Sequence, residues 1–356
     1  MKKNIFLSIA TFLITLFFAE LALDLILGNK NKQNIAFQRY MLFSEGDVFK
    51  NIGKVFKYYP NRKITSKVFY DVNNELIEEY SYTIQTNNYG LVQKNDIEKN
   101  KPSILFLGDS FTEGSGYEAW INKFEGTYRN YQVINGGIMG AGFSQFELLD
   151  KYISKDYNLK KVIVLYIGDD LRRDIFNHNK DVINCLKDYL NCKGYENFYG
   201  FNQSNLYEQL NFLKSNRISN NTKHKKSFKF YRRLIKKHLS QLSIFYYPHI
   251  ILKNKFYKSK NEKKISNLES INNLIEKYKS NIIFIRLKQR QEIISGDSYN
   301  SIYTRDYINQ KISQHFECNF NNDINNFYKY DRHPNKKGYE VLFRCVEDIL
   351  DKKLLK

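Results

Sequence analysis

The sequence has little cysteine, and its few cysteines do not form a metal-binding pattern. The four cysteines include no CxxC pair, and no histidine lies at ligand spacing from any of them. A metal site built on cysteine is therefore not expected. Cys185 and Cys192 lie seven positions apart, and in an oxidising compartment they could close a short loop. Buried free thiols are the alternative.

Acidic residues are almost missing from one long stretch. Between Lys214 and Lys264 the chain has 16 Lys or Arg and a single acid, Glu262, so this stretch carries most of the net charge of +19. Charge runs of this kind are usually a solvated, partly mobile surface. The alternative is a surface that meets anionic lipid head groups or an acidic glycan. We interpret residues of about 175–264 as a basic helical insertion.

The N-terminus lacks charge over a long apolar run. Two lysines precede an uncharged run from Ile5 to Ala19, and Glu20 and Asp24 interrupt its continuation to Leu27. The apolar stretch is about 23 residues long, enough to cross a bilayer. No small-residue cleavage site follows it, so residues 1–28 are predicted to be a retained signal anchor, with a buried core helix as the alternative.

This anchor predicts the location of the protein. The two lysines keep the N-terminus in the cytoplasm, so the chain crosses the inner membrane once and its body lies on the periplasmic or equivalent side. A nucleic-acid partner is not expected there. The 356 residues, of which 42% are hydrophobic, suffice for one large globular domain or two smaller ones, and we find no internal repeat.

Apolar strand candidates alternate with helical patterns from residue 101 to the end. The strand candidates are Ile104–Leu107, Tyr131–Ile134, Val162–Ile167 and Ile282–Leu287, and the helical patterns cover about 117–126, 143–155, 263–279 and 336–350. This alternation predicts an α/β domain over 101–356 whose parallel sheet is covered on both faces. The basic insertion falls between its third and fourth strands. Residues 29–100 are predicted to be a stalk and a β-hairpin that turns at Asn73-Asn74.

Three strand exits carry polar or glycine-rich sequences: GDS at 108–110, NGGIMGAG from Asn135, and GDDLRRD from Gly168. Ligands bind outside the carboxyl ends of the strands in such sheets, so these exits are expected to meet at one site. Ser110 stands where the next helix begins, and its backbone N–H can face a developing oxyanion. As a nucleophile, however, Ser110 needs a base.

His333 is the histidine best placed to be that base. Of the six histidines, four lie in or beside the basic insertion and His315 lies in a helical pattern. His333 instead precedes the last helix, with Pro334 after it and Asp331 two positions before it. A carboxylate beside the imidazole can set its tautomer and leave the other nitrogen free to accept a hydroxyl proton.

Together, GDSFTEG, NGGIMGAG and DRHPNKKG resemble the motifs of the SGNH/GDSL hydrolase superfamily. The resemblance covers roughly residues 84–350, including the lead-in TNNYGLV, and is closest to the membrane-anchored extracytoplasmic branch. It implies a three-layer α/β/α, flavodoxin-like fold. It also implies a serine-dependent ester hydrolase that acts on O-acyl groups, O-acetyl foremost, of an envelope glycan, without metal or cofactor.

The same resemblance assigns residue roles. Ser110 is the nucleophile, His333 the general base and later the acid, and Asp331 orients His333. Gly140 offers its backbone N–H to the oxyanion beside that of Ser110. The family's third oxyanion donor is an Asn side chain, and this chain has Asp169 in its place.

That replacement matters because an ionised carboxylate cannot donate a hydrogen bond. Losing one oxyanion donor costs on the order of 2.7–4 kcal/mol in the barrier. Asp169 could stay protonated, helped by Asp170 and by burial, or Arg172 or Arg173 could neutralise it. Otherwise the site is slow or inactive. Two further functions therefore stay open: an O-acetyltransferase subunit that works with a membrane acyl-donor partner, and a non-catalytic glycan-binding protein.

Overall fold

The structure is a computed structural model. It describes residues 2–27, 38–45, 48–52, 55–72, 75–173, 198–200 and 261–354, together with residues 208, 210, 211 and 215. The chain divides into two compact units. One comprises residues 1–37 and 210–257, and the other comprises Gln38–Gln209 and Lys258–Lys356. The candidate catalytic residues all belong to the second unit.

Five parallel strands form the central sheet of this second unit, in the order β11-β10-β8-β6-β7. Their bounds are β6 Ser103–Gly108, β7 Gln132–Gly137, β8 Leu159–Tyr166, β10 Ile282–Leu287 and β11 His315–Cys318. Read along the chain, this is the flavodoxin-like order. The predicted α/β class is confirmed, and the four predicted apolar runs correspond to β6, β7, β8 and β10.

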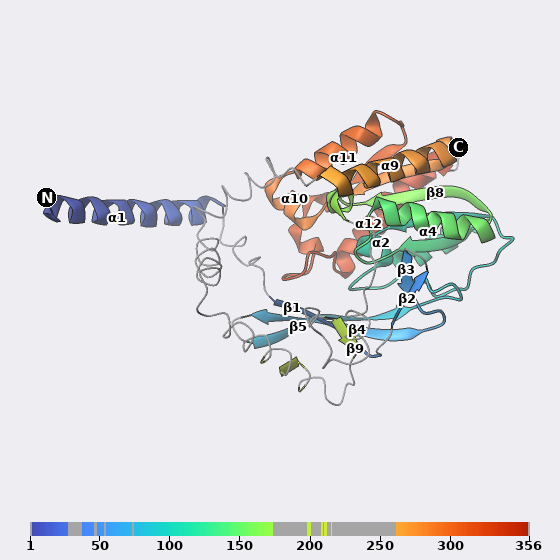
Figure 1. The fold of residues 1–356 in the computed structure, drawn as a ribbon, viewed down its shortest axis with the longest axis horizontal. Helices are drawn as coiled ribbons and strands as arrows, with labels where there is room; N and C mark the ends of the chain where they lie inside the picture. Colours follow the sequence, from blue (N-terminus) through green and yellow to red (C-terminus); the bar gives the residue numbers. More distant parts are fainter. Residues whose placement is uncertain are drawn as a thin grey trace. The chain divides into compact units, whose positions relative to one another are not determined.

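Helices cover both faces of the sheet, as the alternation predicts. On one face, α4 (Phe143–Asp156) and α9 (Asn261–Tyr278) pack against each other (Figure 1) and contact β6 and β10, respectively. On the other face, α12 (Lys336–Leu354) joins a buried cluster with the alternate strand side chains Ile104 and Phe106. Neighbouring residues of a strand point to opposite faces, so each strand supplies both layers.

Some elements were not indicated by the sequence pattern. β11 is a fifth strand, and α10 (Arg290–Ser295) and α11 (Tyr299–Asn309) follow β10. Only one of the four residues of β11 is buried, so this strand lacks the apolar run that marks the others. Where one helix was expected over 117–126, the chain forms two short ones, η2 (Trp120–Lys123) and α3 (Phe124–Thr127).

The second unit also contains a mostly antiparallel sheet, in the order β5-β4-β1-β9. Its strands are β1 Gln38–Phe43, β4 Lys63–Val72, β5 Glu75–Gln85 and β9 Phe198–Gly200. The pairing of β4 with β5 confirms the predicted hairpin, although the two turn residues lie outside the described part of the chain. A separate ribbon pairs β2 (Phe49–Ile52) with β3 (Val55–Tyr58). The sequence predicts a domain boundary near residue 100. In the structure, this sheet and the α/β domain belong to the same compact unit.

The predicted anchor segment is helical, as α1 (Lys2–Leu27). In the portion of the chain that the structure describes, no helix combines the length and the apolar character of a membrane span. The anchor stays a prediction. Most of the basic stretch between Lys214 and Lys264 lies outside the described residues, so its predicted role is likewise untested.

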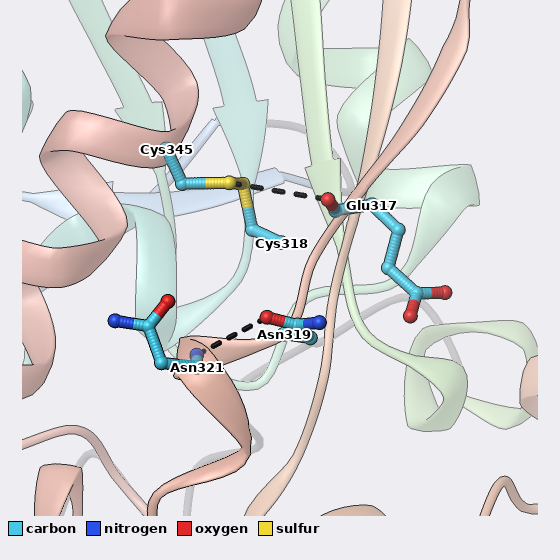
Figure 2. Close-up of a disulfide and its surroundings, with 5 residues drawn as sticks. All are labelled: Glu317, Cys318, Asn319, Asn321 and Cys345. Atoms are coloured by element: carbon cyan, nitrogen blue, oxygen red, sulfur yellow. Dashed lines mark hydrogen bonds between the residues drawn. A yellow bond between two sulfur atoms is a disulfide. The ribbon is translucent and has the colours of Figure 1, made fainter.

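A disulfide joins Cys318, the last residue of β11, to Cys345 in α12 (Figure 2). The two Cα atoms are 6.0 Å apart, and 27 positions separate the cysteines in sequence. The sequence did not predict this pair, because that spacing says nothing about proximity until α12 lies beside β11. Cys185 and Cys192, for which the sequence leaves a bridge or free thiols open, lie outside the described residues. The observed bridge ties down the helix that directly follows the His333 loop.

Replacing both Cys318 and Cys345 by serine should lower the free energy of unfolding by about 3–4 kcal/mol. The bridge closes a loop of 27 positions and thereby restricts the unfolded chain, and this restriction is lost in the double variant. Denaturant unfolding of oxidised wild type and of the double variant measures the difference. Equal stabilities would contradict this role for the bridge.

Candidate active site

The structure brings Ser110, His333 and Asp331 into one hydrogen-bonded line. Ser110 is the first residue of α2 (Ser110–Glu113), directly after β6, and His333 lies in the loop before α12. The Ser110 Oγ is 2.8 Å from His333 Nε2, and His333 Nδ1 is 2.6 Å from Asp331 Oδ1. A carboxylate can only accept from Nδ1, so Nε2 is left to accept the serine proton.

Asp331 is held as a buried carboxylate. The side chain is 5% exposed, and its Oδ1 also accepts the backbone N–H of Arg332 at 2.6 Å. Burial alone would raise the pKa of Asp331, but the charges of Arg39 and His333 and the hydrogen bonds from His333 and Tyr80 hold this pKa well below its usual range. Asp331 therefore faces the imidazole as an anion.

The turn that presents Ser110 is fixed by a buried cluster of charges. Asp109 caps α2, and its Oδ1 accepts the Phe111 N–H at 2.9 Å. One nitrogen of Arg173 donates to Asp109 Oδ2 at 2.7 Å, to Asp170 Oδ1 at 2.8 Å and to the Ala141 carbonyl at 3.2 Å. Arg173 thus connects all three strand exits. The sequence offered Arg173 as a partner of Asp169, but in the structure it bridges Asp109 and Asp170.

Gly140 lies in the β7–α4 loop with a φ of +77°, a backbone conformation that favours glycine. The neighbouring N–H groups of Ile138, Met139 and Ala141 donate to Gly108 O, Glu113 and Ile138 O, respectively. For the Gly140 N–H we find no acceptor within the described part of the chain. The first N–H groups of a helix also have no partner within it, and Ser110 opens α2. These two N–H groups are the candidate oxyanion donors.

The Asp169 side chain is an ionised carboxylate and not a neutral acid. Arg172 binds it with two hydrogen bonds, from Nε to Oδ1 at 2.9 Å and from Nη2 to Oδ2 at 2.7 Å. Burial opposes ionisation, but the bonds and charge of Arg172, with Arg173 and Arg332 further away, lower the pKa of Asp169. Of the two explanations that keep the site active, this geometry favours neutralisation by Arg172. Both Asp169 oxygens are occupied by that guanidinium.

Three other residues of the site were not found by sequence reasoning. Glu113 is buried, and its Oε2 accepts the Met139 N–H at 2.8 Å, one residue before Gly140. Arg39 and Tyr80 come from the antiparallel sheet and contact Asp331. No local pattern marks these contacts, because 251 positions separate Tyr80 from Asp331. Among the described residues, no group of three or more His, Cys, Asp or Glu side chains is arranged to hold a metal ion.

Comparison with known proteins gives only distant likenesses. The sequence matches no family model and no curated protein. A GDSL-like lipase from Bacteroides thetaiotaomicron VPI-5482 is similar at a TM-score of 0.32 and 12% identity, over 70% of this chain and 88% of the other. A putative acylhydrolase from Bacteroides fragilis NCTC 9343 is similar at a TM-score of 0.33 and 12% identity, over 75% and 93%. At these values the likeness assigns no activity to the chain.

Glu113 should make stability fall as pH rises. Burial raises its pKa from 4.5 to about 7, so the folded protein holds this proton more tightly than the unfolded chain. The resulting stability is complete below about pH 4.5 and is lost as pH rises through 7, by about 3 kcal/mol in total. Glu113→Gln has no ionisable group at this position, so it does not lose stability in this way as pH rises. Its stability relative to wild type should therefore increase by that amount between pH 4.5 and 8.

Denaturant unfolding of both proteins across this pH range measures the difference. Glu276→Gln makes the same substitution at an exposed position of α9 and is the control. A relative stability of Glu113→Gln that does not change with pH, or that changes as much in the control, would contradict the assignment.

Proposed function

We propose that the protein is a serine-dependent ester hydrolase that works through an acyl-enzyme. The observation that carries this proposal is the line from Ser110 Oγ through His333 to the buried Asp331, with distances of 2.8 Å and 2.6 Å. A hydroxyl, an imidazole and a carboxylate in this order form a charge-stabilised nucleophile and base.

The reaction follows from the positions of these groups. The Ser110 oxygen attacks the ester carbonyl carbon while its proton passes to His333 Nε2, and the N–H groups of Ser110 and Gly140 receive the negative oxygen. Collapse breaks the bond to the alcohol, which takes the proton from His333. Water then attacks the acyl group on Ser110 and gives a proton to His333. The second collapse returns that proton to Ser110 and releases the acid.

The proposed substrate is an O-acyl group, O-acetyl foremost, on an envelope glycan. The proposed place is the extracytoplasmic side of the inner membrane, with the N-terminal helix as the anchor. Two observations support this. The Cys318–Cys345 disulfide is typical of an oxidising compartment. The 16 cationic residues between Lys214 and Lys264 suit an acidic polymer or anionic lipid.

Two alternatives each have an observation in their favour. The apolar N-terminal helix favours an O-acetyltransferase subunit that receives acyl groups from a membrane acyltransferase partner, and product formation that depends on a sugar acceptor would reveal it. The ionised Asp169 favours a non-catalytic glycan-binding protein, and a Ser110 that never reacts with a fluorophosphonate would support that alternative.

Ser110→Ala should abolish hydrolysis of a small aryl acetate by the full chain at pH 5–9. The nucleophile is gone, so turnover falls by roughly 10³-fold or more. Initial rates and fluorophosphonate labelling measure this, with the exposed Ser313→Ala as the control. Hydrolysis that persists in folded Ser110→Ala would contradict the proposed nucleophile.

Asp169→Asn should keep or raise turnover, since the amide can donate where the carboxylate cannot. The gain can reach about 10²-fold where a missing oxyanion donor is restored. Arg172→Gln should lower turnover in the wild-type background, because it leaves the Asp169 charge beside the site unpaired, but not in the Asp169→Asn background. Steady-state kinetics of the four proteins test this, and a collapse of activity in Asp169→Asn would contradict it.

A further inference from the structure

We propose that the antiparallel sheet is part of the catalytic apparatus, in which Arg39 of β1 and Tyr80 of β5 position Asp331 and limit how strongly it holds a proton on His333. This inference rests on the proposed function. It makes Arg39 and Tyr80 positioning residues, since they act through Asp331 and not on the substrate.

The two oxygens of Asp331 face two different parts of the molecule. Oδ1 accepts from His333, whereas Oδ2 accepts the Tyr80 hydroxyl at 2.6 Å. Arg39 Nε is 3.3 Å from the same Oδ2, and another nitrogen of Arg39 donates to the Tyr80 oxygen at 3.1 Å. The Tyr80 hydroxyl therefore accepts from Arg39 and donates to Asp331. The sheet thus fixes Oδ2 of the carboxylate, and the imidazole of His333 contacts Oδ1 of the same group.

The antiparallel sheet also holds the backbone of the loop that carries Asp331 and His333. A carboxylate oxygen of Glu79 accepts the Tyr330 N–H at 3.1 Å, one residue before Asp331. The Tyr80 ring stacks on Tyr328 with 4.4 Å between ring centroids. The Tyr328 hydroxyl in turn donates to the Gly116 carbonyl at 2.5 Å, in the segment after α2. The loop is thus held between the sheet and the segment that follows the nucleophile.

These contacts have an electrostatic consequence. A carboxylate beside an imidazole stabilises the protonated ring, and a guanidinium on the other oxygen draws part of that negative charge away. Arg39 is about one-quarter exposed and Asp331 is 5% exposed, so water screens the pair only partly. Arg39 should thus free the base of its proton at lower pH than Asp331 alone would allow. Within the described part of the chain, the side chains that act on Asp331 include Arg39, Tyr70, Glu79, Tyr80, Tyr328 and His333.

The test is the pH dependence of the site in the full chain. In Arg39→Gln, Asp331 holds the imidazolium more strongly, so the acidic limb of kcat/KM for an aryl acetate should move up by roughly 0.5–1 pH unit. Arg39→Lys should restore much of the wild-type profile. Tyr80→Phe should lower kcat by about 10-fold or more, because the carboxylate loses an orienting hydrogen bond. Lys67→Gln removes a cation from β4, where Lys67 pairs with Glu78, and should leave the profile unchanged.

A second measurement does not require turnover. NMR titration of the histidine ring protons, with the His333 signal assigned by its loss in His333→Ala, should show a midpoint at higher pH in Arg39→Gln than in wild type. An unmoved midpoint would overturn the inference even if the protein is an esterase. A moved midpoint without Ser110-dependent hydrolysis would support the electrostatic link and count against the proposed function alone.

Discussion

A buried carboxylate must be compensated, and the organisation of this site follows from that constraint at Asp331. At 4% exposure the residue has little water around it, and an unpaired charge there would cost several kcal/mol. Compensation comes from β1, from β5 and from the loop that carries the carboxylate itself, through Arg39, Tyr80 and His333. The carboxylate that contacts His333 therefore also binds the antiparallel sheet to the α/β domain.

A second compensated cluster lies at the turn that presents Ser110. Asp109 and Asp170 follow two adjacent strands as fully buried acids, and a single nitrogen of Arg173 bonds to both. Burial and the neighbouring Asp109 raise the pKa of Asp170 well above its usual range. Strand order explains why these groups meet, because β6 lies between β7 and β8 and the carboxyl ends of parallel strands share one edge. The cluster that neutralises the acids also determines where Ser110 and Gly140 stand. The contacts of Arg173 thus both compensate the buried acids and fix the geometry of the site.

The pattern of residues along the chain alone predicts part of the fold and part of the candidate site. The apolar runs gave β6, β7, β8 and β10, and the short motifs indicated Ser110, Asp331 and His333, which the structure brings within hydrogen-bond distance. β11 lacked a pattern because it is short and mostly unburied. The contacts of Arg39 and Tyr80 are set by sheet packing, which no spacing along the chain encodes. The interpretation of residues 29–100 as a stalk and a β-hairpin therefore did not include their contacts with Asp331.

The spread of the site along the chain bears on when it forms. The Ser110–His333 bond spans 223 positions and the Tyr80–Asp331 bond spans 251. During synthesis from the N-terminus, the sheet and the nucleophile turn emerge long before the base and its acid. A nascent or truncated chain that ends before residue 331 therefore has Ser110 without His333 and a sheet without the carboxylate that it binds. The proposed acyl chemistry thus requires the chain to be made and folded at least through residue 333.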